Sequence, residues 1–125
     1  MARTVFTLRI LVRACALVLI VLGVLFWIGR AFDLIGLHML VGIVLVVVLW
    51  ILAGLAIGAR LAPGLVAFAF IWGLVVVALG MAHAQLLPGS AHWVIQVLHL
   101  LVGLSAVGLA ETLGRRIVTR APAAR

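Results

Sequence analysis

The sequence has little charge, and almost none of it is acidic. Charged residues make up 9% of the 125 residues: nine arginines, no lysine and two acids, Asp33 and Glu111. A soluble domain carries about 25% charged residues, and a chain of this size cannot hide a hydrophobic content of 69% from water. The composition therefore excludes a soluble globular domain, and its high hydrophobicity excludes intrinsic disorder.

Cysteine and catalytic polar side chains are also scarce. Cys15 is the only cysteine, which excludes an intrachain disulfide and a cysteine-based metal site. There is no Ser/His/Asp set, no pair of neighbouring carboxylates and no phosphate-binding loop, so we predict no catalytic residues for hydrolysis or phosphoryl transfer. The absence of asparagine, and of any acid between Arg13 and Arg30, argues against small fluoride channels and small multidrug-resistance transporters.

Long apolar runs fill most of the chain. Four of them, at about 14–29, 34–58, 64–84 and 91–113, are each close to the ~20 residues that a helix needs to cross a bilayer. They do not alternate as barrel strands do, and the short connections between them favour antiparallel neighbours. We predict a single all-α domain over 1–125, an integral membrane four-helix bundle with up-down-up-down topology in contact with the lipid bilayer.

Arginine is distributed unevenly around these runs. Eight of the nine arginines precede the first run, follow the second or follow the fourth, and Arg30 is the exception. The positive-inside rule then places both termini in the cytoplasm and predicts a multi-pass protein of the cell inner membrane. The first run lacks a small-residue cleavage site, so we expect a retained span. The basic tail is typical of a topology signal and a contact for anionic lipid, and we predict no nucleic-acid partner.

A seven-residue segment occurs twice. Residues 37–43 (LHMLVGI) match residues 98–104 (LHLLVGL) at five of seven positions, including a histidine followed four residues later by a glycine. The two hairpins that contain these segments enter the membrane in the same direction, so a pseudo-two-fold axis along the membrane normal would relate them. We therefore predict two pseudo-symmetric helical hairpins that bring His38 and His99 to similar depth on facing helices.

The repeated histidine predicts a pair of ligands. An ionisable residue inside a membrane span is costly and is a functional candidate by default. Two neutral imidazoles on opposite sides of one iron are what a bis-histidine haem requires, and Gly42 and Gly103, one turn further on, leave room for the macrocycle. We predict that His38 and His99 bind haem b. Hydrogen bonding between helices and a different metal are the alternatives.

Two further histidines, His83 and His92, flank the second outer connection. They are either solvated at the interface, in contact with the haem propionates, or ligands of a second haem or a metal. Arg30 is either the partner of Asp33 in an interfacial ion pair or an anchor for a propionate.

The last run has one polar or small face at helical spacing. Gln96 lies between two histidines on this face, which indicates that it points into the bundle. Glu111, near the inner interface, is expected to pair with Arg115, four residues on. The face comprises His92, Gln96, His99, Gly103, Ala106 and Ala110.

The motifs resemble the four-helix haem-binding unit of the heme A synthase family, in which each half of a duplicated eight-helix protein holds a histidine pair on its second and fourth helices. The resemblance rests on the spacing of His38 and His99 and on their His-x-x-x-Gly setting, and it covers the whole chain. It implies a small membrane b-type cytochrome. The family's catalytic half carries a glutamate one turn before the ligand histidine, where this sequence has Ile35 or Leu34.

This difference favours electron transfer over haem modification. We expect electrons to be exchanged near the outer leaflet with a quinol or a periplasmic redox partner. Two other functions remain open: a non-redox accessory subunit of a larger membrane complex, and a heme A synthase-like enzyme that modifies haem.

Overall fold

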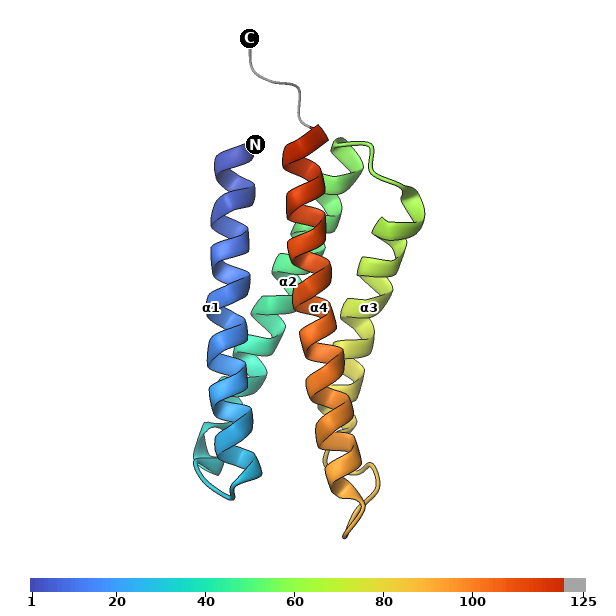
Figure 1. Ribbon diagram of the computed structural model, residues 1–125. Helices are drawn as coiled ribbons and strands as arrows, with labels where there is room; N and C mark the ends of the chain where they lie inside the picture. Colours follow the sequence, from blue (N-terminus) through green and yellow to red (C-terminus); the bar gives the residue numbers. More distant parts are fainter. Residues whose placement is uncertain (121–125) are drawn as a thin grey trace.

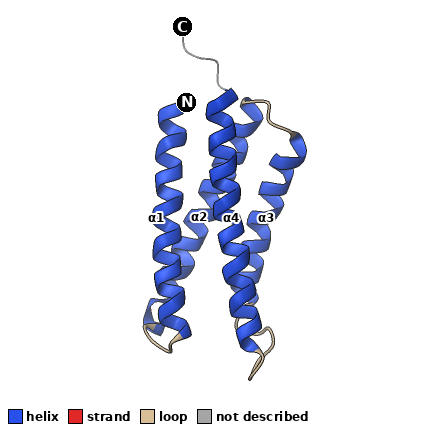
Figure 2. Cartoon of the chain, viewed as in Figure 1, coloured by secondary structure: helices blue, strands red, loops and turns tan. Residues whose placement is uncertain are grey.

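The computed structural model describes residues 1–120. Within that range the chain is helical and contains no strand. Figure 1 shows neighbouring helices running in opposite directions, with the N-terminus and the end of the last helix at the same end of the bundle; Figure 2 shows the short connections between them. The predicted all-α four-helix bundle is confirmed. Its elements are α1 (Ala2–Trp27), a 3₁₀ turn η1 (Phe32–Leu34), α2 (Ile35–Gly58), α3 (Pro63–Ala82) and α4 (His92–Arg120).

The outer surface of the bundle is apolar. All four helices are long and apolar enough to cross a membrane, and leucine, isoleucine and valine side chains are exposed along each of them. A soluble monomer rarely exposes large contiguous apolar surface. The chain is therefore a multi-pass membrane protein whose helices face lipid.

The first and last helices are longer than the apolar runs predicted at 14–29 and 91–113. Helix α1 begins at Ala2, and α4 continues to Arg120. The additional turns carry arginines, whose long stems can follow apolar surface while the guanidinium reaches polar surroundings. An apolar run ends where the arginines begin, so hydropathy alone underestimates the length of these two helices.

Helices α1 and α2 end in the same kind of backbone turn. They are followed by Gly29 and Arg60, which have positive φ angles of 76° and 54°. In each turn two N–H groups beyond the helix donate to carbonyls of its last turn, as in a Schellman motif. A left-handed backbone costs about 1–2 kcal/mol for a residue with a Cβ atom and almost nothing for glycine. The turn at Arg60 is strained, and it is held by Leu61, which is buried in the core.

Buried side chains gather toward one end of the bundle. We term the end of the bundle where α1 begins and α4 ends the arginine end. The opposite end, which carries the four histidines, is termed the histidine end. On α2 every buried residue lies at Leu45 or beyond it, and on α3 the last is Val76. Near the histidine end, the buried residues of the described chain are Leu22 and Ile95, which lie outside the main core cluster.

Close packing within the core depends on small residues and tryptophans. The Trp50 indole N–H on α2 donates to the carbonyl of Phe70 on α3, at 3.2 Å. A Cβ atom on Gly73 would overlap that indole, so the absent side chain lets the two helices approach. The Trp72 indole N–H on α3 donates to the hydroxyl of Ser105 on α4, at 2.8 Å. Helix α3 is thereby fixed to both neighbours.

Candidate functional site

Four imidazole rings form a continuous chain across the histidine end. His38 lies on α2 and His99 on α4, and their ring centroids are 6.2 Å apart. His83, immediately after α3, is 5.4 Å from His99. His92, the first residue of α4, is 4.9 Å from His83. All four side chains are half-buried. This histidine chain runs from the interior face of α2 to the connection between α3 and α4.

Helical spacing explains how α3 and α4 contribute to the histidine chain. His92 and His99 are seven residues apart, two helical turns, and therefore share a face of α4. On α3, Gly80 lies beside the ring of His99, where a Cβ atom would be 3.5 Å from the imidazole Cε1. The small residue gives the ring space against α3, and His83 follows on the same face one turn later.

The central pair carries unpaired polar atoms. The Nδ1 atoms of His38 and His99 are buried and have no hydrogen-bond partner. A buried polar group without a partner costs about 1–3 kcal/mol, so it calls for a functional explanation. The ring of Phe26 packs edge-on against His38, with centroids 5.4 Å apart. His38 is thus covered by an apolar ring on the side of α1.

The spacing of His38 and His99 fits two ligands on opposite sides of one metal. Two metal–nitrogen bonds of about 2.0 Å, plus the distance from nitrogen to ring centre on each side, separate the two centroids by about 6 Å. The observed separation is 6.2 Å. There is room nearby: a Cβ atom on Gly103 would have no neighbour within 4 Å, and one on Gly42 would meet only Leu19, at 4.0 Å.

The outer pair is arranged differently. The Nδ1 atom of His92 lies 3.1 Å from the carbonyl oxygen of Leu86. Because a carbonyl only accepts, His92 donates from Nδ1, and Nε2 is the nitrogen that this contact leaves unused. Burial lowers the pKa of His83 below its ordinary value, and the adjacent His99 and His92 rings lower that pKa further. Burial therefore favours the neutral form of His83, which is the form that binds metals.

The remaining predicted binding residues lie at the same end, and the ion pair that was one of the two alternatives for Arg30 is not formed. Arg30 is exposed. Within residues 1–120 both ion pairs involve Glu111, so Arg30 and Asp33 do not form one. Gln96 is half-buried on the inward face of α4, between His92 and His99. The prediction that this face points into the bundle is confirmed by Ala106 and Ala110, which are buried further along it.

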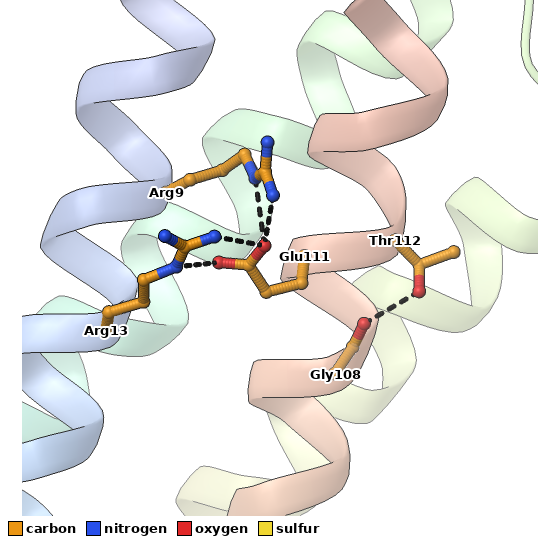
Figure 3. Close-up of polar contacts among 5 residues, drawn as sticks. All are labelled: Arg9, Arg13, Gly108, Glu111 and Thr112. Atoms are coloured by element: carbon orange, nitrogen blue, oxygen red, sulfur yellow. Dashed lines mark hydrogen bonds and ion pairs between the residues drawn. The ribbon is translucent and has the colours of Figure 1, made fainter.

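The predicted pairing of Glu111 with Arg115 is wrong. Glu111 on α4 accepts from two arginines of α1, with 2.6 Å to Nη2 of Arg9 and 2.8 Å to Nε of Arg13 (Figure 3). Arg115 is exposed. The rotation of α4 turns its carboxylate toward α1, and Gly114 lets the stem of Arg9 lie across α4, where a Cβ atom would be 2.6 Å from Cδ. Spacing within one helix could not reveal this contact.

Residues 1–120 contain no preformed site for a free metal ion with three or more protein ligands. Among the described residues, no three histidine, cysteine, aspartate or glutamate side chains converge closely enough to hold an ion. Comparisons of the chain with protein-family models, with curated proteins and with solved structures give no match. Its function is inferred from the histidine chain itself.

Proposed function

We propose that the protein is a small membrane b-type cytochrome in which His38 and His99 are the axial ligands of one haem b. The observation that carries the proposal is the pair itself: two half-buried rings 6.2 Å apart, each with a buried and unpartnered Nδ1 atom. A bound haem would supply one-electron transfer, with a reduction potential tuned by its axial ligands and by burial. The resemblance to the haem-binding unit of the heme A synthase family supports the same function.

The surrounding residues have complementary roles in this proposal. Phe26 holds the ring of His38 from the side of α1 and excludes water from it. Gly42 and Gly103 leave the space that a flat macrocycle needs next to its ligands. Arg30, exposed and without an ion-pair partner in the described chain, is available to a propionate. Gln96, half-buried between two histidines on α4, would donate a hydrogen bond to the same group.

The spacing of the outer pair favours one haem over two. Axial ligands on opposite faces of an iron need centroids about 6 Å apart, whereas His83 and His92 are 4.9 Å apart. This shorter distance suits adjacent positions around a metal. The stoichiometry that we propose is therefore one haem b per chain, bound by His38 and His99.

The distribution of arginines supports an orientation. With the arginine end in the cytoplasm, as the positive-inside rule requires, the histidine end faces the outer side of the cell inner membrane. A haem bound there would exchange electrons with a quinol or a periplasmic redox partner, at the depth where both can reach it.

Optical spectra of the purified protein test the haem proposal. Protein produced with haem available should show Soret absorption and a low-spin spectrum, and a redox titration should show one step. His38→Ala and His99→Ala should each abolish the low-spin spectrum, while His92→Ala keeps it. Circular dichroism would confirm that the variants remain helical.

A colourless protein would contradict the proposal. Co-purification of that colourless protein with other membrane subunits would favour the accessory-subunit function. Conversion of the haem side chains in a reconstituted system would favour heme A synthase-like chemistry. Retention of the low-spin spectrum in both ligand variants would show that other residues hold the iron.

A further inference from the structure

We infer that His83 and His92 form a second, separate site, which binds a divalent transition-metal ion at the surface of the histidine end. The site goes beyond the proposed function, because neither residue is an axial ligand in that proposal. It uses a pair of imidazoles from the end of α3 and the start of α4, joined by the connection over residues 83–91.

The geometry of the pair matches two ligands of one ion at adjacent positions. Imidazoles bound to one ion at a tetrahedral angle have centroids about 5 Å apart, given metal–nitrogen bonds of about 2.0 Å. The observed separation is 4.9 Å, with the ring planes at 84°. The central pair, at 6.2 Å, suits opposite positions instead. The histidine chain thus contains two pairs with different coordination geometry.

The hydrogen bond of His92 has the arrangement of a prepared metal ligand. A metal-binding histidine almost always donates its other ring N–H to a carbonyl or carboxylate, which fixes the tautomer and the ring orientation. Nδ1 of His92 donates to the carbonyl of Leu86 in this way, at 3.1 Å. The Leu86 N–H in turn donates to the Ala82 carbonyl, at 3.2 Å, so the accepting carbonyl is anchored to the end of α3.

The ligand types define the class of ion. Imidazole nitrogen suits Zn²⁺, Co²⁺, Ni²⁺ and Cu²⁺, whereas Mg²⁺ and Ca²⁺ prefer oxygen ligands. No third histidine, cysteine or carboxylate completes the group within residues 1–120, so water would fill the remaining positions. Ions can reach the pair from outside, because residues 84–91 of the connection are exposed.

Titration with Co²⁺ tests the site directly, since tetrahedral Co²⁺ absorbs visibly, and calorimetry with Zn²⁺ provides a second measurement. The protein is purified in detergent without a histidine tag. Wild type should bind one equivalent of either ion. His83→Gln and His92→Gln should each weaken binding at least tenfold. His38→Gln is the matched control, because it removes an imidazole of the same chain and should leave Co²⁺ binding unchanged.

Several results would overturn the inference. If wild type binds no stoichiometric Co²⁺, or if both outer-pair variants bind it as tightly as wild type, the result contradicts the site. An equal loss of binding in His38→Gln would place the ion between His38 and His99. Displacement of bound haem by Zn²⁺ would likewise show a shared site. Failure of the haem proposal is distinguishable, because protein without a haem spectrum would still bind Co²⁺ at His83 and His92.

Discussion

The two ends of the bundle differ in what lies between the helices. At the arginine end small residues are buried and α1 is joined to α4 by one carboxylate and two guanidiniums. At the histidine end few side chains are buried, and four rings occupy the space with two unpaired nitrogens. The small buried residues, which extend from the middle of the bundle to the arginine end, are Ala53, Ala56, Ala69, Gly73, Ala106, Ala110 and Gly114.

This difference separates stability from function. Helices in lipid associate through close packing and interhelical hydrogen bonds, because lipid tails are as apolar as the side chains they meet. The arginine end supplies both kinds of contact. The histidine end forgoes them and keeps polar groups unsatisfied, which a native protein tolerates mainly at functional sites. Substitutions should therefore damage folding at one end and binding at the other.

The largest effect on stability is expected at Glu111, the only acid with ion-pair partners in the described chain. Glu111→Gln removes the counter-charge of Arg9, which is half-buried, and of Arg13, which is exposed, and should lower the free energy of unfolding by about 2–3 kcal/mol, chiefly through the hydrogen bonds of Arg9. Denaturant titration in detergent measures the change. Asp33→Asn removes the other acid of the chain, which is exposed at the histidine end, and should leave stability unchanged. Equal effects of the two substitutions would contradict the assigned role of the cluster.

A smaller loss is expected from filling the contact between α2 and α3. Gly73→Ala should lower the free energy of unfolding by about 2 kcal/mol, because the new methyl group displaces the Trp50 indole from its hydrogen bond with Phe70. Gly54→Ala is the matched control, since a Cβ atom there meets nothing within 4 Å. Thermal unfolding followed by circular dichroism compares them. A Gly73→Ala protein with unchanged stability would show that the Trp50 side chain can move aside at little cost.

Replacing a glycine at the histidine end with a larger residue should weaken haem binding and leave stability nearly unchanged. Gly103→Leu adds a side chain whose Cβ atom would have no neighbour within 4 Å, so the free energy of unfolding should change by no more than about 1 kcal/mol. The same side chain would occupy space proposed for the macrocycle, and haem affinity should fall about tenfold, or about 1.4 kcal/mol. Haem titration and unfolding of the same sample separate the two effects. Unaltered haem affinity would remove Gly103 from the proposed site.

The smallest effect is expected in the turns. Arg60→Gly relieves a left-handed backbone and should raise the free energy of unfolding by about 0.5 kcal/mol, after the entropy gained by the unfolded chain is subtracted. Gly29→Ala introduces the same strain at the histidine end and should lower it by about 1 kcal/mol. Parallel denaturant titrations compare the two turns, and opposite signs are the expected result.

The sequence predicted the fold because the relevant signals are local. Apolar length marks each span, and short connections leave little choice of topology. The repeated His-x-x-x-Gly predicted that His38 and His99 would lie close together, as they do at 6.2 Å. Their binding of haem remains a prediction.

Contacts that depend on how helices are rotated against each other were not predictable. The sequence rule for pairs four residues apart favoured Arg115 for Glu111, whereas the structure joins Glu111 to residues 98 and 102 positions earlier. The proximity of the His83 and His99 rings likewise depends on how α3 packs against α4, and the hydrophobic periodicity of the sequence does not specify that packing. The sequence did contain signals for the Glu111 contact: two arginines one turn apart, Arg9 and Arg13, and a glycine, Gly114. They predict the contact only when α1 and α4 are already known to be adjacent.

The ion cluster at the arginine end has a consequence for how the protein is made. Arg9 and Arg13 emerge from the ribosome about a hundred residues before the carboxylate that neutralises them. Until α4 has inserted, two guanidiniums of α1 lack their counter-ion, so the first helix cannot settle against its final neighbour. Assembly of the bundle is completed by α4, the last of the four helices to be synthesised, and a chain truncated before His92 should be exposed to membrane quality control as an open, three-helix intermediate.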